Sequence, residues 1–291
     1  MSQSKELEVQ KTYKLYINGA FPRTESGRYL KIEDSDGAFL ANVCHGSRKD
    51  LRNAVEAARK AFFGWSQKTS FNRGQILYRM AEMLEDRKQT FMECLLKTGM
   101  SNQDSQNQVS DSIDLLVYYA GWADKYQQVF SSVNPVSGSY FNFSAYEPSG
   151  VVTIFSEGEK ILYDMIASFI PAITGGNSVV IIVNQNSAPC ALNFAEVIAT
   201  SDVPSGVVNI ISSIPSEIYE HAAGHMDINN IIAQSLSDDD LTQMEKLAAN
   251  NVKRIIRSEE IEPSPYQILN TLEVKTTWHP IENISSGGSG Y

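Results

Sequence analysis

The side chains best suited to chemistry are three cysteines and four histidines, and their spacing limits what they can do. His221 and His225 stand four residues apart, so on a helix they would share a face and could hold a metal ion. Gly224 lies between them and indicates a helix end, and the sequence supplies no third ligand nearby, so we expect no metal site. Cys190 opens a predicted helix, where a thiol pKa can fall, but its apolar neighbours favour a buried structural cysteine.

The sequence contains no glycine-rich motif of the dinucleotide-binding or P-loop type. The segment IPAITGGNSVVIIVNQNSAP, Ile170 to Pro189, nevertheless predicts a buried helix, a tight turn, an apolar strand and a polar loop before the next helix. That is the layout of a nucleotide-binding crossover. Such strands are usually followed by a cationic or hydroxylated side chain. Here the strand continues as Ile181-Ile182-Val183 instead.

Composition and charge exclude several classes of protein. Of 291 residues, 42% are hydrophobic and 20% are charged, as in ordinary globular proteins. A net charge of -10 argues against nucleic-acid binding, because duplex binding depends on cationic contacts to phosphate. The sequence has no apolar run of the roughly 18 residues that span a bilayer, and the polar start MSQSKELEVQK does not resemble a secretory signal. Three cysteines at unrelated spacings favour reduced thiols, so we expect a cytoplasmic protein without a membrane partner.

The first half of the chain predicts a hairpin followed by helices. KLYINGAF, Lys14 to Phe21, alternates around an Asn-Gly pair and predicts a β-hairpin. Three helices are expected after it: one capped by Ser47, one with a break near Arg87, and one beginning at Asp111. SYFNFSAYEPSG, Ser139 to Gly150, then alternates at period two and predicts an extended strand.

From Gly150 onward, short apolar runs alternate with helical stretches. The runs are Val151–Phe155, Val179–Val183, Val207–Ile211, Ile228–Ala233 and Val252–Ile256. Five strands and four crossovers predict an α/β fold with a Rossmann-like, doubly wound parallel sheet. The expected division is a hairpin and helical part (1–138), an arm strand (139–150), the sheet (151–262), a C-terminal arm strand (263–285) and a flexible tail (286–291).

Six short segments in order and register resemble the aldehyde dehydrogenase superfamily. They are KLYINGAF, AVEAARKAFFGWS, YYAGWADK, EPSGVV, PAITGGNSVV and VPSGVVNII. The resemblance implies that the sheet is the family's cofactor domain. It also implies that TLEVKTTW, Thr271 to Trp278, closes the family's oligomerisation arm.

The family's oxyanion and ribose contacts are replaced in this chain. Members of the family place a Trp-Asn-Phe-Pro motif after the first strand, and its Asn amide donates to the oxyanion. Here Gly158 and Glu159 take the Trp and Asn positions, and an ionised carboxylate opposes an oxyanion because it only accepts hydrogen bonds. The Lys and Glu that bind the adenosine ribose correspond to Ile182 and Gln185, and Ile182 offers no donor.

The family's phosphate contacts are also altered. A Gly-Ser pair at a helix N-terminus cradles the pyrophosphate in the family, and this chain has Ser235 and Leu236 there, followed by three aspartates at 238–240. Helix N-termini attract anions, but these carboxylates would repel phosphate even if they serve as ordinary first-turn and capping residues. The resemblance therefore implies that this chain binds no cofactor.

The family's general base and nucleophile have no clear counterpart. The base follows the fifth strand, where this chain has Ser258, and Glu259 and Glu260 are the shifted candidates. The sequence has no cysteine after Cys190, so we expect no catalytic residue. Because 291 − 258 = 33 residues remain and include the arm strand, we expect the catalytic domain to be absent. The chain thus resembles the truncated second domain of sixteenth-family aldehyde dehydrogenases, here as a separate polypeptide.

These observations favour a non-catalytic subunit that acts by assembly, either as a homodimer or as a hetero-oligomer with an active, full-length aldehyde dehydrogenase. An exposed strand edge is a liability unless it is paired, and strand addition is an established binding mode. The residues expected at the oligomerisation surface are Tyr140, Phe141, Asn142, Phe143, Leu272, Glu273, Val274 and Lys275. Two alternatives remain open: an NAD(P)-dependent oxidoreductase acting on aldehydes through an atypical site, and a sensor that binds another ligand in the vacated crevice.

Overall fold

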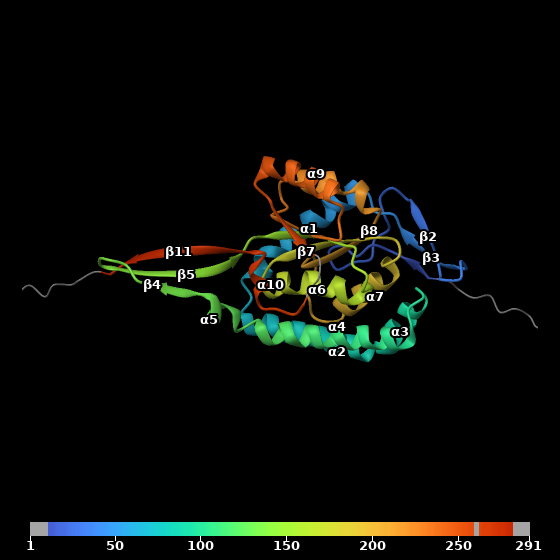
Figure 1. The fold of residues 1–291 in the computed structure, drawn as a ribbon, viewed down its shortest axis with the longest axis horizontal. Coiled ribbons are helices and arrows are strands. Elements are labelled where there is room, and N and C mark those ends of the chain that lie inside the picture. The colour runs from blue at the N-terminus through green and yellow to red at the C-terminus, as the bar shows by residue number, and fades with distance from the viewer. Residues whose placement is uncertain (1–10, 259–261, 282–291) are drawn as a thin grey trace, which may run out of the picture.

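The computed structural model describes residues 11–258 and 262–281, so the predicted tail (286–291), Glu259 and Glu260 lie outside the described residues. Within this range an α/β body carries a narrow β arm that projects from one end (Figure 1). At the centre of the body lies a five-stranded sheet in the order β10-β9-β6-β7-β8, and all neighbouring strands are parallel. The prediction of a doubly wound parallel sheet is confirmed.

The strands of the central sheet are short apolar runs because both faces of a parallel sheet are buried. Four of them are buried at every residue, and only the edge strand β10 is partly exposed. All five predicted strands are present, with the last three beginning one or two residues later than predicted. Their bounds are β6 Val151–Ser156, β7 Ser178–Val183, β8 Val208–Ser212, β9 Asn230–Gln234 and β10 Arg254–Ser258.

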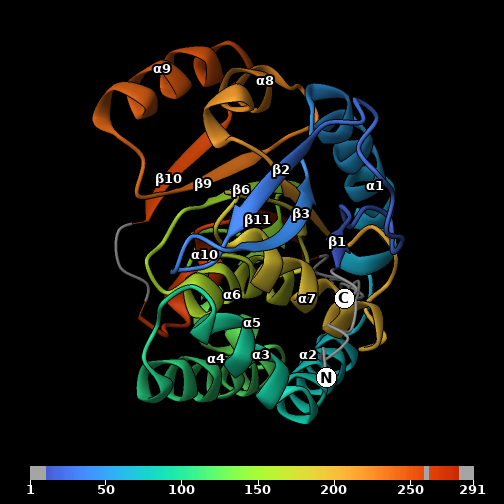
Figure 2. The ribbon, with the colours of Figure 1, turned by 90° about the vertical axis from the view of Figure 1, so that its right-hand side faces the viewer.

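Helices cover both faces of this sheet (Figure 2). Their bounds are α1 Arg48–Ser66, α2 Ser70–Asp86, α3 Lys88–Leu96, α4 Asn102–Trp122, α5 Tyr126–Phe130, α6 Ile161–Thr174, α7 Ala188–Ala199, α8 Tyr219–Gly224, α9 Asp238–Ala248 and α10 Tyr266–Leu269. One core cluster lies between the sheet and α6 and α7, with α2, α3 and α4 packed behind them. The other lies between the sheet and α1, α8 and α9.

Local capping signals set the helix starts. The Ser47 side chain accepts a hydrogen bond from the Asp50 N–H at 3.4 Å, and the Asp50 carboxylate accepts one from the Ser47 N–H at 2.8 Å. This capping box begins α1 as predicted. The break at Arg87 between α2 and α3 is also confirmed. The third predicted helix begins earlier than predicted, because Ser101 caps it and places its first residue nine positions before Asp111.

The predicted hairpin over residues 14–21 is present as a short hairpin around its turn. Asn18 and Gly19 adopt φ values of 55° and 73°, and the residues on either side of them exchange two backbone hydrogen bonds. The flanks do not form a regular two-stranded ladder. Instead Tyr16 exchanges backbone hydrogen bonds of 2.9 and 2.8 Å with Ile210 of β8. The Leu15 N–H also bonds to the Pro22 carbonyl oxygen across the hairpin at 3.1 Å. The predicted hairpin is therefore present but short, and Tyr16 bonds to β8 on its other side because neighbouring residues of a strand point their backbone groups in opposite directions.

A small N-terminal sheet lies at the end of the body opposite the arm (Figure 1). Its order is β1-β3-β2, with bounds Thr12–Tyr13, Phe39–Cys44 and Tyr29–Glu33.

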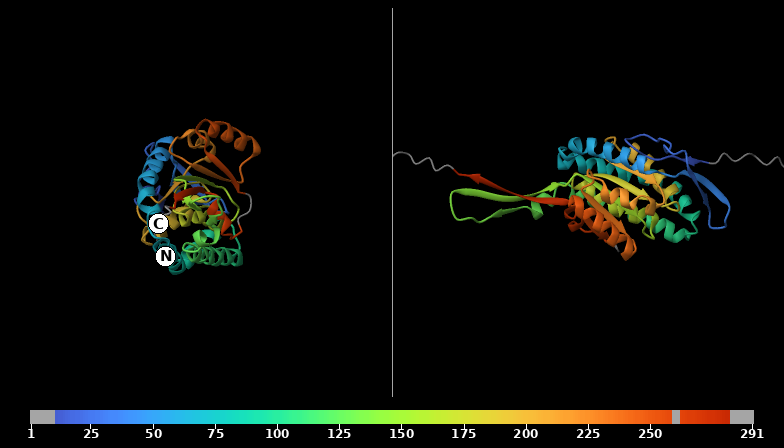
Figure 3. Two further views of the ribbon diagram at one scale, coloured as in Figure 1. Left: turned by 90° about the vertical axis from the view of Figure 1, so that its left-hand side faces the viewer. Right: turned by 90° about the horizontal axis from the view of Figure 1, so that it is seen from above.

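The arm is a three-stranded antiparallel sheet in the order β11-β5-β4 (Figure 3, right). Its strands are β4 Ser132–Asn134, β5 Tyr140–Pro148 and β11 Leu272–Pro280. β11 pairs with β5 over nine residues, from Leu272 opposite Pro148 to Pro280 opposite Tyr140. The two predicted arm strands therefore pair with each other, and β11 begins 272 − 258 = 14 positions after β10 ends.

The buried side chain of Asn177 joins the arm to the central sheet. Its carbonyl oxygen accepts hydrogen bonds from the Gly150 N–H at 2.9 Å and the Ser149 hydroxyl at 3.3 Å. Its amide group donates to the carbonyl oxygens of Ala172 at 3.3 Å and Thr271 at 3.1 Å, and to the Thr271 hydroxyl at 3.1 Å. One carboxamide therefore fixes the end of α6, the start of β6 and the root of β11.

We predict that Asn177→Ala lowers the free energy of unfolding by about 2–3 kcal/mol, because it leaves the buried Gly150 N–H without its acceptor. Urea denaturation followed by circular dichroism measures the loss. Asn186→Ala, at an exposed loop position, is the matched control and should change stability by less than about 0.5 kcal/mol. A loss for Asn177→Ala as small as that of the control would contradict the role given to this side chain.

Candidate functional site

The candidate site is the crevice at the carboxyl end of the sheet, where the strand order reverses. From β6 the chain proceeds to β7 and β8 on one side, and it then returns to place β9 on the other side of β6. Open parallel sheets bind ligands at such a reversal. The loops that follow β6 and β9 flank this reversal, and they carry Glu157 to Lys160 and Ser235 to Ser237.

The structure places the sequence-predicted positions in different surroundings. Glu159 is exposed in the loop after β6 and lines a cavity of about 500 Å³, while Gln185 is exposed in the loop after β7. Ser235 is exposed and Leu236 half-buried in the loop before α9. Ser235 has a φ of 53°, a left-handed conformation that favours glycine. Ile182 alone is fully buried, so it does not face the crevice.

Ile182 belongs to the core on the α1 side of the sheet. It lies in one apolar cluster with Phe155, Val180 and Ala222. A cationic side chain there would lose its hydration without gaining a carboxylate from these neighbours. Ile182, where the family resemblance implies a ribose contact, is thus part of the core packing of β7.

The loop after β6 is closed around an acidic side chain of α6. The Asp164 carboxylate accepts a hydrogen bond from the Lys160 N–H at 2.9 Å. A Cβ atom added at Gly158 would lie 2.2 Å from an oxygen of this carboxylate. The tryptophan that the family resemblance implies at position 158 therefore does not fit this loop conformation.

The N-terminus of α9 is capped by the chain itself. The Ser237 hydroxyl accepts a hydrogen bond from the Asp240 N–H at 3.2 Å and donates one to the Asp240 carboxylate at 2.7 Å. Asp238 pairs with Arg257 at 2.8 Å. The three aspartates lie in the first turn, where the helix dipole favours carboxylates, and their charge repels a phosphate at the same place.

Sequence reasoning missed a second acidic group in the crevice. Glu157 follows β6 directly and accepts a hydrogen bond of 2.6 Å from the Tyr219 hydroxyl at the start of α8. The Tyr219 ring stands edge-on to Phe155 with centroids 4.8 Å apart. Burial raises the pKa of Glu157, and the charge of Asp240 raises it further. Burial and the bond to Glu157 raise the pKa of Tyr219. The sequence FSEGEK contains both glutamates, but the family resemblance indicates a role for position 159 only.

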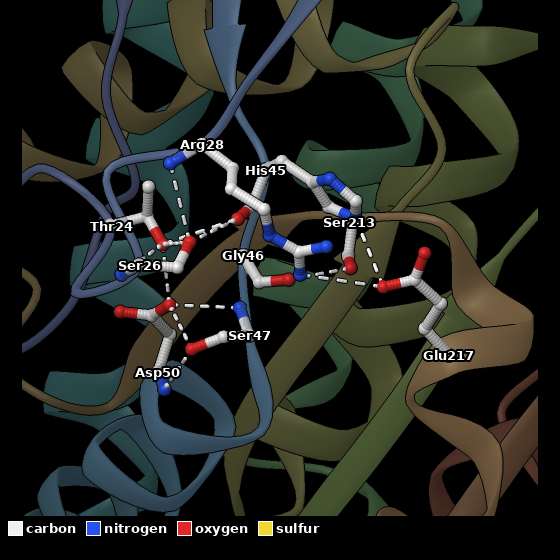
Figure 4. A network of polar contacts seen from close by, with 9 residues as sticks. All are labelled: Thr24, Ser26, Arg28, His45, Gly46, Ser47, Asp50, Ser213 and Glu217. Atoms are coloured by element: carbon white, nitrogen blue, oxygen red, sulfur yellow. Dashed lines mark hydrogen bonds and ion pairs between the residues drawn. The ribbon is translucent and has the colours of Figure 1, made fainter.

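A second polar network joins the residues after β8 to the loop before α1 (Figure 4). The Ser213 hydroxyl donates to the Gly46 carbonyl oxygen at 2.8 Å. His45 Nε2 lies 3.2 Å from the Glu217 carboxylate, which Arg28 also contacts at 3.4 Å. These polar groups contact one another, so the network stabilises the join between the N-terminal sheet and the body.

Several residues at the strand reversal differ from those that the family resemblance implies for a dinucleotide site. Ile182 supplies no hydrogen-bond donor, Asp164 occupies the space beside Gly158, and Glu157 and Asp240 add acidic side chains next to the loops after β6 and β9. Among the described residues, no group of three or more His, Cys, Asp or Glu side chains could hold a metal ion. Across residues 11–258 and 262–281, the helices are too short or too polar to cross a membrane.

Fold and crevice together define a doubly wound α/β protein of the dinucleotide-binding type with an altered site. The model of the aldehyde dehydrogenase family matches residues 21–257, which is 237 of 291 positions. The chain therefore belongs to the aldehyde dehydrogenase family, as its sequence motifs predicted.

Curated relatives match most of this chain but only part of their own length. It is 29% identical over 262 residues to the putative aldehyde dehydrogenase DhaS of Bacillus subtilis, covering 88% of this chain and 52% of the relative. It is 28% identical over 247 residues to omega-crystallin of Enteroctopus dofleini, covering 83% and 49%. It is 29% identical to cytosolic 10-formyltetrahydrofolate dehydrogenase of Xenopus laevis over 86% of this chain and 28% of that protein. The chain thus spans about half or less of these relatives.

Solved structures show the same fold. PnpE from Pseudomonas sp. WBC-3 superimposes with a TM-score of 0.81 at 25% identity, over 86% of this chain and 51% of that one. An NAD+ complex of aldehyde dehydrogenase from Bacillus cereus superimposes with a TM-score of 0.80 at 24% identity, over 85% and 50%.

The raised pKa of Glu157 predicts a specific dependence of stability on pH. Because the folded pKa lies above the unfolded one, ionising Glu157 costs folding free energy, and stability falls as pH rises from the unfolded pKa of about 4.3 through the folded pKa. Glu157→Gln keeps an acceptor for Tyr219 and removes this cost. We expect it to melt at the same temperature as the unmodified chain near pH 3 and at a higher temperature at pH 7.

Melting temperatures followed by circular dichroism over this pH range test the prediction. Glu245→Gln, an exposed change on α9, is the control and should not reproduce the difference. Equal melting temperatures for the unmodified chain and Glu157→Gln at pH 7 would show that Glu157 is not penalised by burial.

Proposed function

We propose that this chain is a non-catalytic aldehyde dehydrogenase-like subunit that acts by assembly and binds no NAD(P). Its arm pairs with a full-length aldehyde dehydrogenase, or with a second copy of the chain. The single observation that carries the proposal is the arm itself. It stands clear of the body (Figures 1 and 3), and its apolar side chains are exposed.

Large apolar side chains gather on the arm at high exposure, between 45% and 68% of their surface. They are Val133, Tyr140, Phe141, Val274 and Trp278. A contiguous exposed apolar surface in a folded protein favours an interaction site. Two residues expected at this surface, Asn142 and Leu272, are instead buried by their own chain, so their side chains do not face a partner.

The two faces of the arm differ, because neighbouring residues of a strand point to opposite sides. One face carries Tyr140 edge-on to Trp278, with ring centroids 5.8 Å apart, and Val274 further along β11. The opposite face carries Phe141 beside Phe143, with centroids 5.6 Å apart. Beside the aromatic side chains of the second face, Lys275 pairs with Glu147.

The backbone of the arm adds a further means of recognition. In the order β11-β5-β4, the outer edge of β11 has no neighbouring strand among the described residues. An unpaired edge of nine residues offers alternating N–H and C=O groups to a partner strand. Apolar faces and an open edge together support assembly, with the apolar residues supplying most of the free energy.

The altered crevice supports the second half of the proposal. The buried Ile182 stands where the family resemblance implies a ribose contact, and Glu157 and Asp240 add acidic groups close to the implied contacts at Glu159 and Ser235. In a family member with such a crevice, the fold and the arm can still serve assembly.

The test measures the mass of the assembled protein, with and without added aldehyde dehydrogenase from the same cell, by analytical ultracentrifugation. We expect the unmodified chain to sediment as a multiple of its own mass or in a complex with the dehydrogenase. The double variant Val274→Glu and Trp278→Glu should lose that assembly, because carboxylates at these exposed positions would have to be buried at the interface.

Phe39→Glu is the control, because Phe39 is also exposed but lies on the N-terminal sheet at the far end of the body. It should assemble like the unmodified chain. A monomer that binds no dehydrogenase at micromolar concentration would overturn the proposal, as would full assembly of the double variant.

A further inference from the structure

Two cysteines that are 190 − 94 = 96 positions apart in sequence meet inside the fold. Cys94 lies on α3 and Cys190 on α7, and the two helices pack against each other (Figure 1). Both cysteines belong to the larger core cluster, and each one's side chain shifts the pKa of the other. Phe91 and Phe194 lie on the same two helix faces and stand edge-to-face with centroids 6.3 Å apart. The helix packing thus places the two thiols on the facing surfaces of α3 and α7.

The surroundings of Cys94 favour its thiolate. The neighbouring Cys190 thiol and Asn193 amide, together with the charges of Lys97 and Lys11, lower the pKa of Cys94, although its burial opposes this. The Asn193 oxygen accepts a hydrogen bond of 2.8 Å from Lys11, which orients the amide group toward the sulfur. The neighbouring Cys94 side chain, with burial, raises the pKa of Cys190. The nearby groups therefore favour a thiolate at Cys94 and a thiol at Cys190.

A small oxidant can reach this pair from the surface. Cys94 is 9% exposed and lines a cavity of about 500 Å³, together with Lys97, Glu159, Asn186 and Pro189. Cys190 lies behind it and is 1% exposed. The geometry thus presents Cys94 as the attacking sulfur and Cys190 as the second sulfur, which is the arrangement of redox-sensor cysteines.

We propose that Cys94 and Cys190 form a redox site that reacts with a hydroperoxide and closes to an intramolecular disulfide. In the first step the Cys94 thiolate attacks the outer oxygen of the peroxide. An S–O bond forms, the O–O bond breaks, and the leaving hydroxide or alkoxide takes up a proton. Cys94 becomes a sulfenic acid, and the peroxide is reduced by two electrons.

In the second step Cys190 loses its proton and attacks the Cys94 sulfur. The S–S bond forms, the S–O bond breaks, and water leaves. With hydrogen peroxide, two thiols and one peroxide give one disulfide and two waters. Side-chain rotation brings the two facing sulfurs to the roughly 2 Å of a disulfide, and a dithiol reductant reverses the reaction by thiol–disulfide exchange.

The disulfide would join α3 to α7 and so connect two elements of the larger core cluster. Cross-linking positions 94 and 190 restricts the unfolded chain more than the folded one, and stability rises. Oxidation should therefore also be detectable without peptide mapping. It should raise the melting temperature, and a dithiol reductant should return the melting temperature to its starting value.

The test treats the reduced, full-length chain with micromolar hydrogen peroxide, blocks the remaining thiols by alkylation, and maps peptides by mass spectrometry. We expect one cross-linked peptide pair containing Cys94 and Cys190. In Cys190→Ala the sulfenic acid on Cys94 cannot condense, so dimedone should trap it. In Cys94→Ala, Cys190 should stay alkylatable. Cys44→Ala is the matched control, because Cys44 is fully buried in the other core cluster, and it should behave like the unmodified chain.

Three outcomes would overturn the proposal: separate alkylation of Cys94 and Cys190 in the unmodified chain after peroxide treatment, no dimedone adduct on Cys94 in Cys190→Ala, or oxidation of Cys44 at the same rate. The first result needs no variant, so the proposal remains testable even if an alanine change in the core impairs folding.

Discussion

The arm keeps its place because one buried carboxamide, that of Asn177, bonds to three parts of the chain at once. The end of α6, the start of β6 and the root of β11 all meet at this side chain. Its donors and acceptors are buried, so each lost bond leaves a polar group without water to replace its partner. The arm is therefore held in a fixed relation to the central sheet, which an assembly surface requires.

The core and the crevice of this molecule follow different constraints. The strands of the central sheet are buried on both faces, and any close-packed set of apolar residues satisfies them, which explains how 24–25% identity gives TM-scores of 0.80 and 0.81. The crevice depends on a few side chains after each strand. Glu157 and Asp240 add negative charge there without disturbing the sheet, so the fold persists where the ligand contacts differ.

The sequence predicted those features that depend on local pattern. The apolar runs predicted all five strands of the central sheet. Ser47 predicted the start of α1, and the alternation after Ser139 predicted an arm strand. It did not predict contacts between residues that are far apart in the sequence. Tyr16 pairs with β8 beside its own short hairpin, and Glu157 bonds to Tyr219, 62 positions away. The contact between Cys94 and Cys190 likewise depends on how α3 packs on α7, which spacing alone does not reveal.

We propose that this family fold is retained for assembly and that its crevice does not accept a dinucleotide. Calorimetric titration of the purified chain with NAD+ and NADP+ tests it most directly, beside an active aldehyde dehydrogenase under the same conditions. The account predicts no saturable heat up to millimolar cofactor for this chain, while the active enzyme titrates normally. Saturable binding in the micromolar range would contradict it.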